Sequence, residues 1–596
     1  MRKFLFLILL AGTSTSVLAD NTSELHKIFD DERAYFWRDN PLVASDEGVS
    51  DYDDRLGSVL PADFARRLGE DKKFLARLNA INRSTLSVED QTSYDLFAFM
   101  VKSRVDFEAF QPWRVPLTSD EGFYIAVMQM HQDSNTQSVR GYERYIARLK
   151  DVPRFFKEHI ANMRQGIQNG FTLPSVVLTG IQRILDAQQA KSAEESPLFA
   201  PFKRFPSFLS QADRVRLEKD GREAIATAII PAFRDLKNFF VTEYAPHARK
   251  TLAASDLPNG RDYYKQLVRY YASYDIAPDE VHEIGLGEVA RIRKEMDDVI
   301  AQTKFAQTDS KGSFDEFLTF LRSSPQFYET TPLGLLKTAA YTAKEIDGKL
   351  PQFFGVLPRM TYRVEPVPAE LAPNYTTGRY NPGPDDGRTP GTYWVNTYAL
   401  NKRPLYALPS LTLHESVPGH HLQGALAREL KKLPAFRRNI YIDAFGEGWG
   451  LYSEKLGVEM GIYKTPYEHF GRLSYEMWRA CRLVVDTGLH WKGWTRDQAL
   501  DYLRRNTALA EHEVQTETDR YISWPGQALS YKLGEMKIWE LRKKAEKKLG
   551  AKFDIRAFHD TVIDSGTMTM PMLERQVERF IVNGERKYVI PAKAGI

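Results

Sequence analysis

The segment LHESVPGHHLQ (413–423) concentrates side chains that can bind a metal ion. Of the 12 histidines in the protein, His414, His420 and His421 lie within eight residues, and Glu415 follows the first. Two imidazoles four residues apart on one helix can share a Zn²⁺ ion. His414 and His420 are six residues apart, which is about 9 Å of helical rise. An unbroken helix therefore cannot bring them together.

Pro418 and Gly419 decide whether the histidines can share an ion. Pro418 cannot donate a hydrogen bond to the carbonyl of His414, and Gly419 tolerates unusual backbone angles. A Pro-Gly bulge can therefore return His414 and His420 to one face, with His421 as the rival second ligand. The alternative is that the helix stops at the residue before the proline, and the histidines cap the next segment.

Glu447 is the candidate third ligand. It lies in DAFGEGWGLYSEKLG (443–457), a helical pattern with glycine on both sides of Glu447 and again at Gly450. Each interior glycine costs about 1 kcal/mol relative to alanine, so we expect another group to approach this backbone closely. Glu447 lies 27 residues after His420, which allows a return on a facing helix. Glu454 lies on the same face and either supports the site from behind or is a surface acid.

Further candidates follow downstream. Asp486 precedes His490 by four residues, so on a helix the acid can fix the imidazole tautomer; an exposed pair is the alternative. Tyr531, near the start of a helix opened by Pro525 and Gly526, can donate to a developing oxyanion or be a core tyrosine. Arg520 can meet a peptide terminus or an internal acid.

These residue types together predict metal-assisted hydrolysis. Zinc with three protein ligands keeps a fourth position for water and lowers the pKa of that water to about 7. Glu415 adjoins a ligand but points elsewhere, so it is placed to act as the general base. Zinc with Tyr531 or His490 would stabilise the oxyanion. We predict one Zn²⁺ ion with ligands among His414, His420, His421 and Glu447, and catalytic roles for Glu415, Tyr531 and His490.

The composition narrows the class of protein. With 81 Lys and Arg against 78 Asp and Glu, the formal net charge is +3, which argues against nucleic acid as a partner. Hydrophobic residues make up 43% of the chain, as in ordinary globular proteins. Cys481 is the only cysteine, so an internal disulfide is excluded.

The N-terminus predicts export. Arg2 and Lys3 precede the apolar run FLFLILLAG, and SVLA ends at Ala19, a pattern typical of a secretory signal peptide over residues 1–19. The apolar run is far shorter than the ~20 residues of a spanning helix. No cysteine follows LLAGTS, so we expect no lipid anchor. The mature protein should be periplasmic or secreted, without a membrane anchor.

Helical periodicity dominates the rest of the chain, as in 144–170, 277–302 and 526–550. The exception is MTYRVEPVP and GTYWVNT, which are rich in β-branched and aromatic residues and are separated by a turn-rich segment. We predict a mainly α fold with two strands beside the site, and GTYWVNT as an edge strand that can pair with an extended peptide. Residues 20–596 form one unit, divisible into helical lobes near residue 350.

The motif His-Glu-x-x-Pro-Gly-His-His followed by Glu-Gly-Trp-x-Leu-Tyr-x-Glu resembles the bacterial DUF885 family. Further similar stretches are VVDTGLHWKGW, ETDRYISWPGQALSYKLG and GTMTMPMLE, so the likeness covers nearly all the mature chain. The resemblance implies a zinc-dependent, metallopeptidase-like hydrolase related to the gluzincins, with a large helical fold around a deep central cleft. It also implies that Glu447 is the glutamate ligand, although Gly446 stands where the gluzincin pattern has asparagine.

We therefore expect an exported zinc peptidase that hydrolyses short peptides. Two alternatives use the same residues: a zinc hydrolase of a non-peptide amide or ester, and an exported zinc-binding protein without catalysis. An intact Glu415 argues against the last, because a structural zinc site needs no base.

Overall fold

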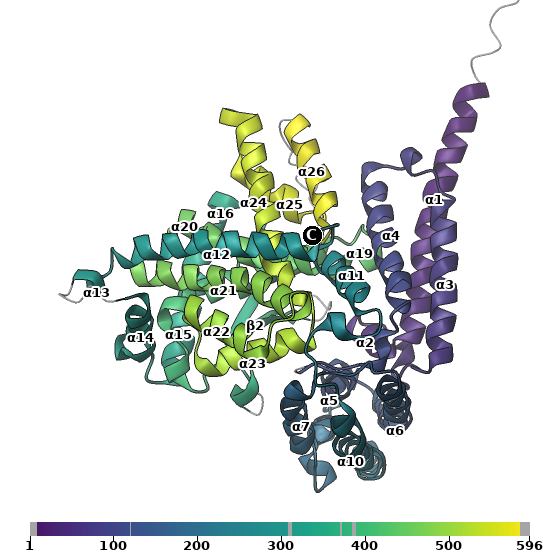
Figure 1. Cartoon of the computed structure of the whole chain (residues 1–596). Coiled ribbons are helices and arrows are strands. Elements are labelled where there is room, and N and C mark those ends of the chain that lie inside the picture. Colours follow the sequence, from purple (N-terminus) through teal and green to yellow (C-terminus); the bar gives the residue numbers. More distant parts are fainter. Residues whose placement is uncertain (1–8, 120, 308–312, 370–371, 384–388, 584–596) are drawn as a thin grey trace, which may run out of the picture. The chain divides into compact units, whose positions relative to one another are not determined.

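The computed structural model of the protein describes residues 9–119, 121–307, 313–369, 372–383 and 389–583 (Figure 1). Helices account for 72% and strands for 4%, which confirms the predicted mainly α fold with a small sheet. Within the described part of the chain, every helix is too short or too polar to span a membrane. The predicted signal peptide begins outside the described residues, and its cleavage and the deep cleft stay predictions.

The chain divides into two compact units. Unit 1 runs to Gln266 and includes Pro434–Phe436 and Ile522–Trp524, and unit 2 contains the remaining residues. The division lies near residue 266, not near residue 350 as the sequence suggested. The reason is that α12 (Pro278–Ile300) packs along α21 (Pro466–His490), deep in unit 2.

Unit 1 is built from amphipathic helices. The longest fully described example, α6, buries one stripe of large side chains and exposes its charged residues. Two π-helical turns, Ile225–Ile229 and Phe240–Tyr244, flank α10. The α-helices that begin in this unit's first segment are α1 (Leu9–Asp39), α2 (Pro41–Asp46), α3 (Pro61–Asn79), α4 (Val88–Glu108), α5 (Phe123–Asp133), α6 (Val139–Gln168), α7 (Leu178–Ala187), α8 (Ala200–Lys203), α9 (Gln211–Ala224), α10 (Ile230–Phe239) and α11 (Gly260–Ala272).

Unit 2 carries the histidine motif and the downstream candidate residues on deeply buried helices. In α17 all eight residues are buried, and α21 is buried on every side from Phe470 to its end, as expected for helices at the centre of a large unit. Its other α-helices, two of which share residues with unit 1, are α13 (Lys304–Gln307), α14 (Phe314–Ser323), α15 (Pro332–Asp347), α16 (Leu350–Phe353), α17 (Leu408–Glu415), α18 (His420–Glu429), α19 (Ala435–Asn439), α20 (Asp443–Glu459), α22 (Arg496–Asn506), α23 (Glu511–Ser523), α24 (Ser530–Leu549), α25 (Ile555–Ile563) and α26 (Met570–Asn583).

The sheet of unit 2 has three strands where the sequence predicted two. Its order is β1 (Tyr362–Pro366), β3 (Gly391–Val395), β2 (Gly378–Asn381), with β1 parallel and β2 antiparallel to β3. The segment GTYWVNT therefore supplies the central strand, and the prediction that it forms an edge was wrong. The extra strand β2 comes from the segment predicted as turns. Its short sequence GRYN is a strand because its backbone pairs with β3.

His159 of α6 is a buried histidine without an ion-pair partner among the described residues. Its ring stacks on Phe123 at 4.1 Å and meets the edge of Phe155 at 4.5 Å. Burial lowers its pKa from 6.5 to about 3. At mildly acidic pH the imidazole of His159 therefore binds a proton in the unfolded chain but not in the folded chain. The free energy of unfolding consequently falls as the pH decreases through about 6.5.

We predict that His159→Phe reduces the acid sensitivity of folding. The native protein should lose about 2 kcal/mol more than the variant between pH 7 and pH 5, as measured by urea unfolding at both values. Substitution of the exposed His247 by Phe is the matched control and should leave the difference unchanged. Equal losses in the native protein and the His159 variant would contradict this role.

Candidate metal centre

The motif helix is broken between His414 and His420. Helix α17 ends at Glu415 and α18 begins at His420, so the helix stops two residues earlier than the alternative interpretation placed its end. The N–H of Gly419 donates to the carbonyl of Leu413 at 3.0 Å, which folds the chain back tightly. A side chain at position 419 would overlap the carbonyl oxygen of His414. The turn thus requires glycine and replaces the bulge that the sequence suggested.

The break brings two imidazoles and a carboxylate together. The rings of His414 and His420 lie 4.7 Å apart and perpendicular. Oε2 of Glu447 lies 3.5 Å from Nε2 of each histidine, and all three ligand atoms lie within 4.8 Å of one another. Two atoms bound at ~2.05 Å to one tetrahedral zinc are about 3.3 Å apart. The observed separations therefore match the donor set of a single metal ion.

One face of α20 holds His414 in place. Glu447, Gly450 and Glu454 share this face, since they are spaced three and four residues apart. Nδ1 of His414 lies 2.8 Å from Oε1 of Glu454, so the proton belongs on Nδ1 and the lone pair of Nε2 faces Glu447. A Cβ atom at Gly450 would come within 2.7 Å of the imidazole. Of the two interpretations of Glu454, this contact favours the supporting residue over the surface acid, and Glu454 is buried.

The other glycines of α20 explain the rest of the GEGWG pattern. A Cβ atom at Gly448 would lie 2.6 Å from the backbone of Gly534 on α24, and one at Gly446 would overlap the ring of Tyr441. The hydroxyl of Tyr441 donates to Oε1 of Glu447 at 3.1 Å. The close approaches expected from these glycines are therefore present, and each positions Glu447.

The charges at the centre favour a cation. Burial alone would lower the pKa of His414, but Glu447, Glu454 and Glu415 raise it to about 10. Burial would raise the pKa of Glu447, but hydrogen bonding to His414 and His420 holds it well below its usual range. The carboxylate is therefore ionised, and the surrounding acids attract positive charge, whether a proton or a metal ion.

His421 points away from this group. Its Nδ1 lies 3.0 Å from the hydroxyl of Tyr380, and its Nε2 lies 3.2 Å from the carbonyl oxygen of Met360. Burial lowers its pKa to about 4, so the ring is neutral. Of the two rival histidines, the structure selects His420 as the companion of His414.

Glu415 is held by the sheet and not by the motif helices. Its Oε2 accepts a hydrogen bond from the backbone N–H of Tyr380, in β2, at 2.8 Å. Tyr380 thus fixes both Glu415 and His421, one through its backbone and one through its hydroxyl. Sequence reasoning missed this residue because it lies in the segment predicted as turns, where no spacing linked it to the motif.

The family assignment follows from the whole chain. A family model described as "Bacterial protein of unknown function (DUF885)" matches residues 41–577. The chain belongs to the DUF885 family. No curated protein matches it.

Two solved structures described as a "putative lipoprotein" are similar to this DUF885 protein. The one from Colwellia psychrerythraea shares 28% identity with a TM-score of 0.89 and covers 94% of this chain and 100% of that chain. The one from Shewanella oneidensis, of unknown function, shares 18% identity with a TM-score of 0.71 and covers 92% of this chain and 98% of that chain. The second likeness shows the fold alone.

The downstream candidates lie outside the three-residue group. His490 is fully buried, and its Nε2 lies 2.9 Å from the carbonyl oxygen of Tyr521. Asp486 accepts from the N–H of Gly526 through both carboxylate oxygens, at 3.1 and 3.0 Å. These contacts tie α21 to the segment before α24, so His490 has a packing role in the structure. Its proposed contact with an oxyanion stays a prediction.

Tyr531 and Arg520 have internal neighbours. Tyr531 is buried in the first turn of α24. Burial, followed by the charges of Glu447 and Asp443 and then by Tyr531, raises the pKa of Tyr441. Arg520 donates to Oε1 of Gln527 at 3.0 Å and lies 3.7 Å from Glu517. An internal acid therefore neighbours Arg520, as one of the two interpretations expected.

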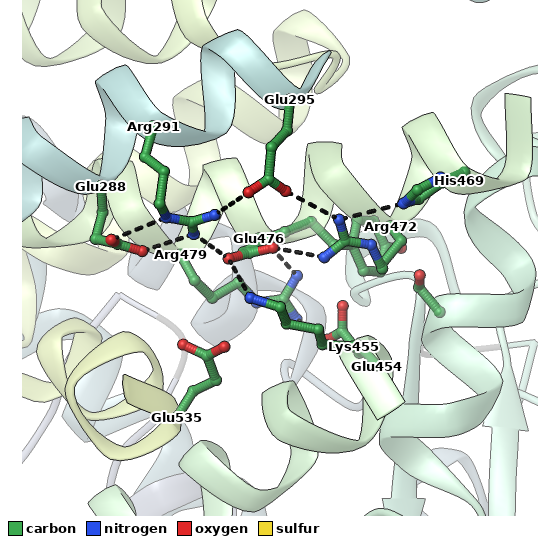
Figure 2. Close-up of polar contacts among 12 residues, drawn as sticks. Glu288, Arg291, Glu295, Glu454, Lys455, His469, Arg472, Glu476, Arg479 and Glu535 are labelled. Atoms are coloured by element: carbon green, nitrogen blue, oxygen red, sulfur yellow. Dashed lines mark hydrogen bonds and ion pairs between the residues drawn. The ribbon is translucent and has the colours of Figure 1, made fainter. Parts of the chain in front are cut away.

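A buried network of ion pairs around Glu476 joins the helices that carry the candidate metal centre (Figure 2). Glu476 of α21 binds Arg472 of the same helix at 2.6 Å, Arg291 of α12 at 2.5 Å and Lys532 of α24 at 2.9 Å. Burial would raise the pKa of Glu476, but Lys532 and the arginines hold it well below its usual range. Lys455 of α20 lies 3.9 Å away. The network thus fixes α20 against α12, α21 and α24.

We predict that His420→Ala abolishes stoichiometric zinc binding, whereas His421→Ala retains it. The reason is that Nε2 of His420 faces Glu447, while both nitrogens of His421 are occupied elsewhere. Elemental analysis after zinc loading and dialysis measures the difference. Loss of zinc from the His421 variant with native circular dichroism would refute this choice of ligand.

We predict that Gly450→Ala weakens zinc binding and destabilises unit 2 by about 1–3 kcal/mol, because the new methyl group overlaps the imidazole of His414. Zinc titration and urea unfolding measure the two effects. Gly287→Ala is the matched control: it lies on the exposed face of α12 with no atom within 4 Å of a new Cβ atom, and should stabilise slightly. Unchanged zinc affinity at Gly450→Ala would contradict the close contact.

Proposed function

We propose that this protein is an exported zinc-dependent peptidase of short peptides. The observation that carries the proposal is the set of three ligand atoms with separations suited to one tetrahedral ion, next to the carboxylate of Glu415. His414, His420 and Glu447 would hold the metal. The donor set of two imidazoles and one carboxylate fits zinc and leaves one position for water.

A bound zinc ion would supply a Lewis acid and a water molecule of lowered pKa. Glu415 would then take the proton of that water and deliver it to the leaving amine. Glu415 is 9% exposed, and its carboxylate is oriented by the N–H of Tyr380. Glu454 keeps the proton of His414 on Nδ1, and this preserves Nε2 as a donor of electrons.

The edge strand β2 supports a peptide substrate. The N–H of Asn396 donates to the carbonyl of Thr377, so alternation along an antiparallel ladder turns the backbone groups of Gly378 and Tyr380 away from β3. The N–H of Tyr380 meets Glu415. An extended peptide added to this edge would therefore run beside the general base. Strand β2 takes the role that the sequence assigned to GTYWVNT.

Export is supported from two sides. Residues 1–19 have the pattern of a secretory signal peptide, and the similar protein of Colwellia psychrerythraea is described as a "putative lipoprotein". In this chain Cys481 is the only cysteine and lies buried in α21. We therefore propose a periplasmic or secreted protein.

Zinc content and a substrate panel test the proposed function together. The zinc-loaded protein is incubated with short peptides carrying free or blocked termini and with matched amide and ester substrates. Cleavage of peptides that stops on chelation and returns with zinc supports the proposal. Cleavage of esters alone favours a non-peptide hydrolase. A chelator that lowers the melting temperature, in a protein that cleaves nothing, favours a structural zinc site.

We predict that Glu415→Gln retains zinc and lowers kcat by about 10²–10⁴-fold, because the amide cannot accept the proton of water. The measurement pairs elemental analysis with hydrolysis of the best peptide from the panel. Glu429→Gln, on the partly exposed end of α18, is the control. Native turnover in a fully zinc-loaded Glu415 variant would remove the residue from the mechanism.

A further inference from the structure

Two arginines on α21 are buried one turn apart with unused hydrogen-bond donors. Arg479 is 5% exposed and Arg482 is 1% exposed. Nε of Arg479 and Nη1 of Arg482 have no hydrogen-bond partner among the described residues. Buried donors in folded proteins nearly always have an acceptor, and a charged donor without one is costly. The two N–H groups therefore remain for an acceptor from outside the chain.

Aromatic rings hold both guanidinium groups. Trp478 lies 4.3 Å from the Cζ atom of each arginine. Tyr531 lies 4.3 Å from Arg482 and 5.8 Å from Arg479, and Tyr475 lies 4.8 Å from Arg479. Cation–π contacts of this kind occupy the flat faces of the guanidinium groups and keep the N–H groups at their edges for in-plane acceptors. A planar carboxylate is the matching ligand, because it can accept two parallel N–H bonds.

The neighbouring acids leave positive charge uncompensated. Nη2 of Arg482 binds Glu517 at 3.0 Å. Arg479 lies 3.6 Å from Glu454, whose same oxygen already accepts from His414. Burial, followed by the charge of Glu517, raises the pKa of Glu513 to about 7 despite these arginines, so this acid is only partly ionised at neutral pH. The group can accept a further negative charge.

Short chains of contacts connect the arginines to the metal centre. Arg479 reaches His414 through Glu454 alone (Figure 2 shows Arg479 and Glu454 beside the Glu476 network). Arg482 lies against the ring of Tyr531. Tyr531 acts electrostatically on Tyr441, and Tyr441 donates to Glu447. A carboxylate bound to this pair would therefore lie within a residue or two of an amide at the metal centre.

We propose that Arg479 and Arg482 bind the C-terminal carboxylate of the substrate, so that the substrates are short peptides with a free C-terminus, cleaved near that end. This inference rests on the proposed peptidase function. Every unblocked peptide carries this carboxylate at a fixed distance from its last amide bond, whereas the distance to an acidic side chain varies. An aspartate or glutamate side chain of the substrate would offer the same carboxylate, and the experiment below distinguishes it from the C-terminus.

The test compares matched peptides with the zinc-loaded native protein. Each peptide is offered as the C-terminal acid and as the C-terminal amide, with and without a glutamate near the scissile bond. We expect kcat/KM for the acid to exceed that for the amide by about 10–100-fold, the usual effect of a charged hydrogen-bonded contact. Equal values for acid and amide would overturn the inference and leave the peptidase function intact. If a glutamate near the scissile bond restores cleavage of the C-terminal amides, the assignment of the arginine pair to the C-terminal carboxylate would be overturned.

The outcomes distinguish the two proposals. If fully zinc-loaded protein cleaves none of the peptides, the proposed function is overturned, and this inference with it. Cleavage of acids and amides alike removes only the inference. The comparison uses the native chain, so it does not depend on whether a variant of a buried arginine folds.

A variant then assigns the effect to the arginine pair. We expect Arg482→Gln to retain zinc and to lower kcat/KM for the acid peptide by at least about 10-fold, while the value for the amide changes little. Arg542→Gln is the matched control, because Arg542 is a buried arginine paired with Glu459 and Glu546, and it should preserve the ratio of acid to amide. A folded Arg482 variant with the native ratio would contradict the assignment.

Discussion

The contact between His414 and one face of α20 is the constraint on which the rest of the centre depends. Glu454 holds Nδ1 of the imidazole, Glu447 faces Nε2, and Gly450 leaves room for the ring between them. Three residues at helical spacing therefore fix the tautomer, the orientation and the distance of one ligand. Because all three belong to a single rigid helix, the geometry is set before any ion binds, which is how metal sites gain affinity.

Such a group of acids at the centre of a helical unit is costly to bury, and the surrounding charges show how the fold offsets the cost. His414 and His420 compensate Glu447, while Arg479 lies near Glu454. Behind them, the network around Glu476 ties together the helices that carry these groups. Removing one member of a buried network leaves another charge unpaired, so the centre and its supporting helices should be stable only as one assembly.

Residue type and local spacing were enough to predict which candidate ligands lie together, but not which residues support them. The mainly helical fold, the close approach at the glycines of GEGWG and the grouping of His414, His420 and Glu447 follow from patterns within single segments. The choice of His420 over His421 could not be made, because it depends on Tyr380, which lies in a segment that looks like turns. The packing of α12 on α21 could not be predicted for a related reason, because it joins residues that are nearly 200 positions apart.

Because the motif helix is interrupted, the candidate ligand His414 and the proposed base Glu415 are held by different elements. His414 is held by α20, which also carries Glu447, whereas Glu415 is held by β2 through the N–H of Tyr380. A group that occupied the outer edge of β2 would therefore act on the proposed base directly while leaving the ligands in place. The three-stranded sheet therefore has a defined part in the centre, because the N–H of Tyr380 in β2 orients the carboxylate of Glu415.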